Sequence, residues 1–355
     1  MSDADEAAVS IGDAVIRPAG GPAYVIAEAG VNHNGDLPSA LRLVEAAARA
    51  GADAVKFQAF RAAALVTADA SAAAYQRERS GPATQRELLR ALELTAEAFA
   101  SLQQRCREVG IEFLATPFGP DDLRMLVDLG VRAVKIASPD LANEPLLGAA
   151  AATGLPLLLS TGAAEPDEIG RAIDVLASRG ARERLILLHC VSSYPTREAD
   201  AHLRRIRTLA ACFGRPTGFS DHTTSVEIGA LAVAAGAAVL EKHLTLDRRL
   251  PGPDQAFSLE PASFAEYVAG VRRAETALGS GVLGVLDAER EVRRLSRRSV
   301  VAAVPIACGE RIGAAQLAIK RPGTGIAPAD LERVAGRVAA VDIPPDTLIQ
   351  WEMLR

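Results

Sequence analysis

The sequence predicts an α/β protein: a (β/α)8 barrel, or TIM barrel, followed by a small C-terminal domain. Three observations carry this prediction. Eight short apolar segments recur along residues 24–245, helix-period segments lie between them, and several of these end in glycine just before the next strand. Strands that alternate with helices in this way are typical of a parallel sheet closed into a barrel.

The eight predicted strands follow one another in a regular series. They are YVIAEAG (24–30), AVKFQAF (54–60), EFLATPF (112–118), AVKIASP (133–139), PLLLSTG (156–162), LILLHCVS (185–192), TGFSDHT (217–223) and VLEKHLT (239–245). Segments between them, such as LPSALRLVEAAARAGA and EPDEIGRAIDVLASRG, have the apolar spacing of amphipathic helices. Glycine is the expected residue where such helices end, at Gly51, Gly110, Gly130, Gly154 and Gly180.

The second link between a strand and a helix is unusually long. Residues 61–95 carry Tyr75, an Arg/Glu-rich turn and a Gly-Pro break. Long loops in compact domains are often functional, so this segment is predicted to be a loop or lid over the barrel mouth. A disordered insertion is the alternative.

Composition limits the class of protein. The 355 residues suffice for a large barrel with a small appendage, and 49% are hydrophobic, which is ample for a core. A net charge of −5 argues against nucleic acid or an anionic membrane as the main partner. The four cysteines lack CxxC spacing, the N-terminal stretch is too polar for a signal peptide, and no apolar run reaches membrane-spanning length. We therefore expect a cytoplasmic protein with reduced thiols.

Two histidines end consecutive predicted strands, His222 in TGFSDHT and His243 in VLEKHLT. A lone histidine at a strand end is more often a hydrogen-bonded structural residue than a ligand. Here both would project into one barrel mouth, and charged residues surround each of them. Two neutral imidazoles in one mouth can hold a divalent metal with coordination positions left open for substrate.

Polar side chains gather at the predicted carboxyl ends of the strands, where TIM barrels carry their active sites. They are Glu28, Asn32 and His33; Lys56 and Gln58; Thr116; Lys135 and Ser138; Ser160 and Thr161; His189, Ser192 and Tyr194; Ser220, Asp221 and His222; and Glu241 and His243. Two lysines at equivalent positions, with many hydroxyls nearby, suit a phosphate or a carboxylate. One strand-end lysine alone would instead suit a Schiff-base aldolase.

The pattern changes after a last barrel helix at about 261–279. Residues 281–296 are charged and are predicted to form a linker from the barrel domain, 1–280. Residues 297–355 contain short strand-like runs separated by Gly and Pro turns, which predicts a small second domain.

The chain resembles the sialic acid synthases, the N-acetylneuraminate synthase family, along essentially its whole length. The matching motifs are IAEAGVNHNGD, GADAVKFQ, FLATPF, VKIAS, LSTG, LLHCVSSYPT, GFSDHT, LEKHLTLDRRLPGPD, SLEP and KRPGTG. The tail resembles that family's antifreeze-like (SAF) domain. The resemblance implies condensation of phosphoenolpyruvate (PEP) with the open-chain aldehyde of an N-acylated amino sugar, with loss of phosphate.

The resemblance also implies roles for individual residues. His222 and His243 match the ligands of a divalent metal, Mn²⁺ or Mg²⁺, and Glu241 is placed to orient a ligand or a water. The PEP-binding positions are matched by Lys56, Thr116, Lys135, Ser138, Ser160, Ser192 and Ser220. The sugar side is matched by Glu28, Gln58, Tyr194 and Asp254, with Glu28 also a candidate general acid or base.

Arg321, in KRPGTG, matches an arginine that reaches the neighbouring subunit's active site, which implies a domain-swapped homodimer. The chain departs from many relatives at Pro139 and Asp140, where Gly and Glu are common, and at His202, where Asn is common. We expect His202 to be an exposed helix residue. PGPD mildly favours a sialic or legionaminic type of sugar over a pseudaminic type.

Three alternatives stay open at this point. The first is a homologous synthase for another sugar, such as legionaminic or pseudaminic acid or a surface-polysaccharide or secondary-metabolite sugar. A Schiff-base aldolase is a different class of barrel enzyme. A non-catalytic sugar-binding relative is the third, and the histidine pair and the two lysines argue against it.

Overall fold

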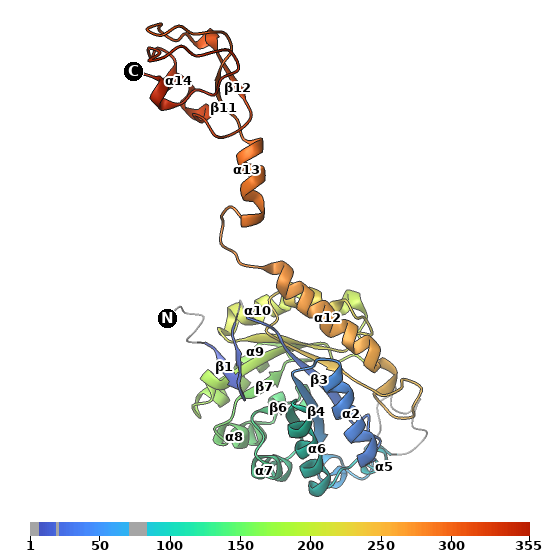
Figure 1. Cartoon of the computed structure of the whole chain (residues 1–355). Helices are drawn as coiled ribbons and strands as arrows, with labels where there is room; N and C mark the ends of the chain where they lie inside the picture. The colour runs from blue at the N-terminus through green and yellow to red at the C-terminus, as the bar shows by residue number, and fades with distance from the viewer. Residues whose placement is uncertain (1–6, 19–20, 71–83) are drawn as a thin grey trace. The chain divides into compact units, whose positions relative to one another are not determined.

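The computed structural model describes residues 7–18, 21–70 and 84–355 (Figure 1). The chain divides into two compact units, Met1–Ser280 and Gly281–Arg355. All four cysteines are unpaired. In the described part of the chain, no helix combines the length and the apolar character needed to cross a bilayer.

The first unit is a nearly closed barrel of eight parallel strands, as the sequence predicted. The strands are β3 (Tyr24–Gly30), β4 (Ala54–Ala59), β5 (Glu112–Pro117), β6 (Val134–Ile136), β7 (Leu157–Ser160), β8 (Leu185–Cys190), β9 (Thr217–Asp221) and β10 (Val239–His243). Hydrogen bonds link them in the order β5-β4-β3-β10-β9-β8-β7-β6. The two strands at the ends of this order, β5 and β6, are also in contact.

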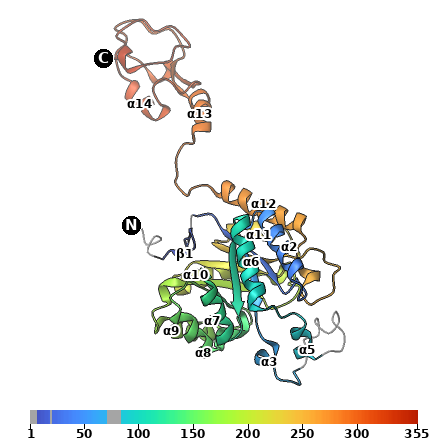
Figure 2. The ribbon, with the colours of Figure 1, turned by 60° about the horizontal axis from the view of Figure 1, so that its bottom comes forward.

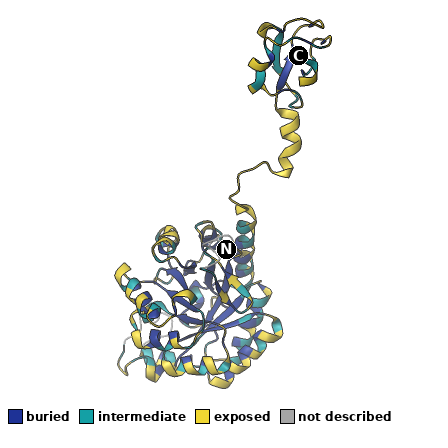
Figure 3. Ribbon diagram, turned by 90° about the vertical axis from the view of Figure 1, so that its left-hand side faces the viewer, coloured by how far each residue is buried: buried dark blue, intermediate teal, exposed yellow. Residues whose placement is uncertain are grey.

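Helices surround the barrel, with their apolar faces on the strands and their polar faces outward (Figure 3). They are α2 (Leu37–Arg49), α6 (Ala96–Val109), α7 (Pro120–Leu129), α8 (Glu144–Ala152), α9 (Pro166–Ala177), α10 (Arg204–Phe213), α11 (Ile228–Ala234) and α12 (Pro261–Leu278). Gly110 and Gly130 end α6 and α7 in the left-handed conformation, with φ of 75° and 84°. This conformation is cheap for glycine and returns the chain toward the next strand.

A hairpin of β1 (Val9–Ile11) and β2 (Ala14–Ile16) precedes the barrel and was missed by the sequence analysis. Val9, Ile11 and Ile16 are buried in one cluster with inward-facing side chains from the barrel strands, including Ile26 and Leu158. These contacts close the amino-terminal end of the barrel with apolar groups. The opposite end is left as the place for polar chemistry.

The long second link contains two short helices on either side of residues outside the described range. α3 (Ala62–Leu65) contacts α5 (Gln85–Arg90), and Figure 2 shows the two helices at the same end of the barrel. Thr84 and Glu87 form a capping box that starts α5. Tyr75 and the Gly-Pro break lie outside the described residues.

The second unit is small and has its own core. It contains α13 (Arg290–Ser296), the antiparallel pair β11 (Ser299–Ala302) and β12 (Leu317–Lys320), and α14 (Leu331–Val334). Its core is made of aliphatic side chains, among them Val300, Ile312 and Ile349. Residues 281–296 are exposed throughout.

Candidate active site

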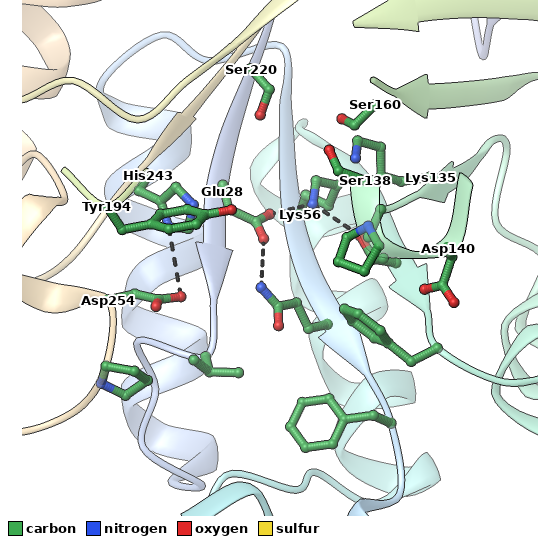
Figure 4. Close-up of a pocket in the computed structure, with 18 of the residues that line it drawn as sticks. Glu28, Lys56, Lys135, Ser138, Asp140, Ser160, Tyr194, Ser220, His243 and Asp254 are labelled. Atoms are coloured by element: carbon green, nitrogen blue, oxygen red, sulfur yellow. Dashed lines mark hydrogen bonds and ion pairs between the residues drawn. The ribbon is translucent and has the colours of Figure 1, made fainter. Parts of the chain in front are cut away.

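A cavity of roughly 360 Å³ opens at the carboxyl ends of the barrel strands (Figure 4). Most of the site residues predicted from the sequence line it. They are Glu28, Lys56, Gln58, Thr116, Lys135, Ser138, Ser160, Tyr194, Ser220, His222, Glu241, His243 and Asp254. These residues come from every strand of the barrel or from the loop that follows it, so only the closed barrel brings them together.

The alternation of side chains along each strand decides which strand-end residues reach the cavity. On β10, Glu241 and His243 line the cavity, whereas Lys242 between them does not. The sequence analysis also placed other polar strand-end residues, such as Asp221 and His189, at the barrel mouth. These two side chains face away from the cavity. Asp221 pairs with Lys242, and His189 contacts the Ala201 carbonyl through Nε2 and stacks on Phe219.

The pair between Asp221 and Lys242 is almost fully buried behind the barrel wall. Lys242 Nζ lies 2.9 Å from Asp221 Oδ2, and the two side chains are 1% and 0% exposed. The ammonium also donates to the carbonyl and hydroxyl of Thr223, and it lies 5.4 Å from the centre of the Tyr267 ring. These contacts join β9, β10 and α12 on the outer side of the wall.

Removing one partner of this pair will destabilise the barrel strongly. We expect Lys242→Met to lower the free energy of unfolding by about 3–5 kcal/mol, because it leaves the Asp221 carboxylate buried without its cation. Urea unfolding of the full chain measures this loss. The double variant Lys242→Met, Asp221→Leu should recover part of it, since no charge is then left unpaired. An unchanged unfolding midpoint in Lys242→Met would contradict this role.

Lys56 lies at the centre of a buried network of charges. Its Nζ is 2.7 Å from Glu28 Oε2 and 3.6 Å from Glu241 Oε2, and it donates to the Thr116 hydroxyl at 3.0 Å. Around it, Gln58 Nε2 donates to Glu28 Oε1 and the Ser220 hydroxyl donates to Glu241 Oε1. Buried charges persist when they are paired and hydrogen-bonded, and this network meets that condition.

Four carboxyl groups line the cavity, those of Glu28, Asp140, Glu241 and Asp254, and the three nearest Lys56 and the histidines differ in the direction of their pKa shifts. Burial and the nearby Glu241 raise the pKa of Glu28, although Lys56 opposes that shift. Burial and the charge of Glu28 raise the pKa of Asp254 to about 7. Burial acts on Glu241 too, but attraction by Lys135 and Lys56 outweighs it and lowers its pKa. Glu28 and Asp254 are therefore the carboxyls suited to proton transfer.

Lys135 has fewer partners than Lys56. Its Nζ donates to the Ile136 carbonyl at 3.1 Å, and burial lowers its pKa. Hydroxyl groups lie near it around Gly162, whose backbone N–H donates to the Ser138 hydroxyl at 3.0 Å. A Cβ atom at Gly162 would lie 2.5 Å from Ser192 Oγ and 2.9 Å from Ser138 Oγ. Because glycine has no Cβ, it leaves these two hydroxyl groups uncovered. The cluster and Lys135 together suit an oxyanion.

The two predicted histidines meet at the cavity, with ring centres 5.4 Å apart (His243 is labelled in Figure 4). His222 Nδ1 lies 2.9 Å from the Val191 carbonyl, an arrangement that assigns the proton to Nδ1 and leaves Nε2 as the ligating nitrogen. His243 Nδ1 is buried without a hydrogen-bond partner in the described structure, 3.9 Å from Asp254 Oδ2. Burial and the positive groups around it hold the pKa of His243 well below its usual value.

This donor set fits a metal held by two imidazoles. His243 has a buried Nδ1 without a hydrogen-bond partner in the described structure and a lowered pKa. A neutral imidazole nitrogen of this kind can bind a cation. Across residues 7–18, 21–70 and 84–355, no group of three or more His, Cys, Asp or Glu side chains is arranged to bind a metal. The protein would therefore supply two ligands and leave the other positions to substrate or water.

Two of the residues with a predicted binding role do not line the cavity either. Ser192 is exposed, but its hydroxyl belongs to the cluster beside Gly162. Arg321 belongs to the second unit, where it is exposed after β12. The Ser299 hydroxyl fastens its loop, since it donates to the Pro322 carbonyl and accepts from the Gly325 N–H. His202 is exposed as expected but precedes α10 with a φ of 45°, so it is no helix residue.

Several lining residues were not anticipated. Cys190 lies 3.9 Å from His222 Nδ1, and the alternation along β8 would have placed it inward. Phe257, which does not itself line the cavity, packs edge-on against the His243 ring, at 4.9 Å between centres. An apolar wall also lines the cavity, built from the long link and from residues that follow β3, β4 and β5. Its residues are Val31, Phe60, Leu65, Leu88, Leu92 and Phe118. The sequence gives no signal that separates such residues from core.

Charged groups buried this deeply in the mouth of a TIM barrel place the chain in the class of barrel enzymes that bind small polar substrates. Comparison with known proteins narrows the class. Residues 43–283 match the NeuB family and residues 297–355 match the SAF domain, and the chain belongs to the NeuB family. The predicted family, barrel and SAF domain are thereby confirmed.

Individual relatives cover nearly the whole chain. The N,N'-diacetyllegionaminic acid synthase of Legionella pneumophila is 41% identical over 95% of this chain and 96% of its own. A solved structure titled as an N-acetylneuraminic acid (sialic acid) synthetase from Leptospira borgpetersenii is 40% identical, with a TM-score of 0.71 over 80% of this chain and 94% of that one. Relatives named as N,N'-diacetyllegionaminic acid, N-acetylneuraminate-9-phosphate and pseudaminic acid synthases are 41%, 34% and 32% identical. The chain is thus a synthase homologue of the sugar-acid type.

Proposed function

We propose that this protein condenses PEP with an N-acylated amino sugar of the N-acetylmannosamine type to a nine-carbon 2-keto acid, with release of phosphate. The observation that carries the proposal is the pair of buried lysines, Lys56 and Lys135, beside the two imidazoles of His222 and His243 in one barrel mouth. An anionic three-carbon substrate and a neutral aldehyde need these two kinds of groups side by side. The family membership supports a sugar-acid product.

The reaction balances without an external oxidant or reductant. C3 of PEP attacks the aldehyde carbon of the open-chain sugar, and the aldehyde oxygen gains a proton and becomes a hydroxyl. Water adds at C2 of PEP, and the C2–O bond to phosphate breaks. The new C2 carbonyl and the C3–C bond belong to the product.

Lys56 and Lys135 are proposed to hold the phosphate and carboxylate of PEP, with hydroxyls from Thr116, Ser138, Ser160, Ser192 and Ser220. Lysine ammonium groups and hydroxyls donate charge-assisted hydrogen bonds to such oxyanions. The lowered pKa of Lys135 is consistent with this role, because burial disfavours its charge until an anion arrives. Gly162 supports the same role by leaving the hydroxyls uncovered.

Glu28, Gln58, Tyr194 and Asp254 are proposed to bind the sugar and to move its protons. The pKa of Asp254, raised to about 7, allows this group to carry a proton near neutral pH, and the pKa of Glu28 is shifted in the same direction. The aldehyde oxygen needs such a proton donor, and the attacking water needs an acceptor. Glu241, whose pKa is lowered, is proposed to orient a water through Oε2, the oxygen that faces Lys56.

His222 and His243 are proposed to hold a divalent metal, Mn²⁺ or Mg²⁺. A bound metal there would supply Lewis acidity toward the aldehyde oxygen. The support is the buried, unpartnered Nδ1 of His243 and the Val191 carbonyl that sets the tautomer of His222. Because PEP is a metabolite of the cell interior, the proposal also implies a cytoplasmic enzyme.

Inorganic phosphate release tests the proposal directly. The full chain is incubated with Mn²⁺, PEP and N-acetylmannosamine or a related amino sugar, and PEP is labelled with ¹⁸O in the bridge between C2 and phosphorus. We expect phosphate release that requires both substrates, with the label in the phosphate because the C–O bond breaks. Release from PEP alone, or no release with any amino sugar of a panel, would contradict the proposal.

A Schiff-base aldolase is the second candidate, and one observation favours it. A buried lysine with a lowered pKa, such as Lys135, is the form that attacks a carbonyl. Borohydride treatment in the presence of pyruvate would then trap an adduct that mass spectrometry places on Lys135 or Lys56. We expect no adduct, since both ammonium groups are assigned to binding an anion.

Arg321 is proposed to act in the active site of a second copy, within a domain-swapped homodimer. Its loop is held by Ser299, and exposed apolar side chains in residues 281–296 suit contact with a partner. Among them, Leu283 is 99% exposed and Val282 is 82% exposed. The guanidinium would offer fork-shaped donors to the sugar's acyl carbonyl and hydroxyls.

Mixing two inactive variants tests this assembly. An Arg321→Ala chain mixed with a His222→Ala chain forms heterodimers with one intact site, and random exchange restores up to about a quarter of the wild-type activity. The double variant Arg321→Ala, His222→Ala mixed with Arg321→Ala is the control, since no intact site can form. If native mass spectrometry shows subunit exchange and activity stays absent, Arg321 does not act across the dimer.

A further inference from the structure

The backbone is held differently at the two histidines of the cavity. His243 is the last residue of β10, and it pairs with Glu28 of β3 in the sheet. His222 follows the last residue of β9, and the ladder between β9 and β10 ends at the pair of Asp221 with Lys242. The ladder between these two strands therefore stops one residue short of both histidines.

The side chains of Asp221 and Lys242 hold the turn that carries His222. Asp221 Oδ1 accepts from the Thr223 N–H at 2.8 Å, which closes the backbone around residue 222. Asp221 Oδ2 accepts from Lys242 Nζ at 2.9 Å, and the same ammonium donates to the Thr223 carbonyl at 2.6 Å and to its hydroxyl at 3.2 Å. The Lys242 ammonium thus binds the residues on both sides of His222.

This arrangement connects one ligand strand to the other. Val191, from the loop after β8, places its carbonyl 2.9 Å from His222 Nδ1, and the Thr196 N–H donates to the His222 carbonyl. Those contacts orient His222 relative to β8. Lys242 adds a connection to β10, where it directly precedes His243. Water does not compete for that connection, because the side chains of Lys242 and Asp221 are 1% and 0% exposed.

Stability alone does not account for a buried ion pair at this place. Apolar side chains of similar volume often stabilise a protein as well as such a pair does. A charged pair differs in its directional, charge-assisted hydrogen bonds, which fix the atoms they join more narrowly than apolar contacts do. Here the joined atoms belong to the residues next to two candidate metal ligands.

We propose that Lys242 is a positioning residue for the metal site, whose ammonium ties the turn of His222 to the strand of His243 and sets the relative position of the two imidazoles. Lys242 does not line the cavity, so it acts through the backbone and touches neither substrate nor metal. The inference rests on the proposed function, in which the two rings hold one divalent metal. Groups behind the ligands commonly orient them in this way.

Mn²⁺ binding to the metal-free full chain tests the inference with a readout separate from turnover. The electron paramagnetic resonance signal of free Mn²⁺ gives the dissociation constant, and urea unfolding gives the stability of each variant. Lys242→Met should weaken Mn²⁺ binding by about 10- to 100-fold, the range found when outer groups that hold metal ligands are removed.

The double variant Lys242→Met, Asp221→Leu separates positioning from stability. It leaves no charge unpaired and should recover part of the stability that Lys242→Met loses. Mn²⁺ binding should nevertheless stay weak, because the hydrogen bonds around His222 are not restored. The same variant carries the test if Lys242→Met does not fold.

Arg215→Met is the matched control. Arg215 lies at the amino end of β9, opposite to His222, and its side chain is 3% exposed and pairs with Glu183 at 2.6 Å. The substitution removes a buried cation next to the same strand. It should lower the urea midpoint and leave Mn²⁺ binding unchanged.

The outcomes separate this inference from the proposed function. Mn²⁺ binding as tight as that of the unmodified chain, in Lys242→Met or in the double variant, overturns the inference and leaves the proposed function standing. Equal weakening in Arg215→Met does the same, because the loss would then follow stability alone. If the unmodified chain itself binds no Mn²⁺, the proposed metal site fails together with the inference.

Discussion

His222→Ala and His243→Ala will each stay folded and lose nearly all turnover, by about 10³-fold or more. The reason is that a Lewis acid at a developing alkoxide supplies several kcal/mol of transition-state stabilisation, and each 1.36 kcal/mol is a factor of about ten in rate. Both imidazoles face the cavity, and the low pKa of His243 keeps it in the ligating form. Chelator treatment of the unmodified chain should have the same effect, and added Mn²⁺ should restore activity.

Metal content provides a readout independent of turnover. After dialysis against Mn²⁺, the unmodified chain should retain the metal and both variants should not. His202→Asn is the matched control, because His202 is exposed and has a positive φ that Asn tolerates. Full activity of His222→Ala in the presence of chelator would remove the metal from the mechanism.

Lys135→Ala will raise the KM for PEP by about 10- to 150-fold, the equivalent of 1.5–3 kcal/mol for a hydrogen bond to a charged group. The KM for the amino sugar should change much less. Lys135 is the more selective of the two lysine tests, because its Nζ donates to a backbone carbonyl, whereas Lys56 pairs directly with Glu28 and Glu241. Initial-rate kinetics with each substrate varied in turn measures both constants.

Lys56→Ala should raise the KM for PEP as well, but it will also lower stability. Its Nζ neutralises Glu28 and Glu241, and both carboxyls are buried. Lys320→Ala, an exposed lysine of the second unit that pairs with Asp346, is the control for loss of a lysine charge. If neither Lys135→Ala nor Lys56→Ala changes the KM for PEP, the lysines do not bind the anion.

The order of the barrel strands could be predicted because each strand is short, apolar and followed by a helix with a clear end. β3 begins and ends at the residues expected from YVIAEAG, and glycines at 110 and 130 end their helices as predicted. The hairpin β1–β2 was missed because two strands of three residues give too few alternations to be recognised.

The sequence predicted the types of residue in the candidate site. It did not show which of the polar strand-end residues face the cavity. Glu28, Lys56 and His243 line the cavity because each occupies an inward position near the end of its strand. Asp221 and His189 looked similar in the sequence, yet a shift of one residue turns a side chain to the other face of the sheet. They pair with Lys242 and Ala201 behind the wall instead.

By itself, the sequence determined the barrel, the small second domain and the set of polar groups at the strand ends, because these depend on local periodicity and on the order of elements. Only the tertiary structure decided which carboxyls carry raised pKa values, since the shifts of Glu28 and Asp254 arise from burial among groups distant in the chain. It also decided that Phe60 and Leu88 form a wall of the cavity. An apolar residue has the same pattern in a core and in a pocket, and only the space left beside it distinguishes the two.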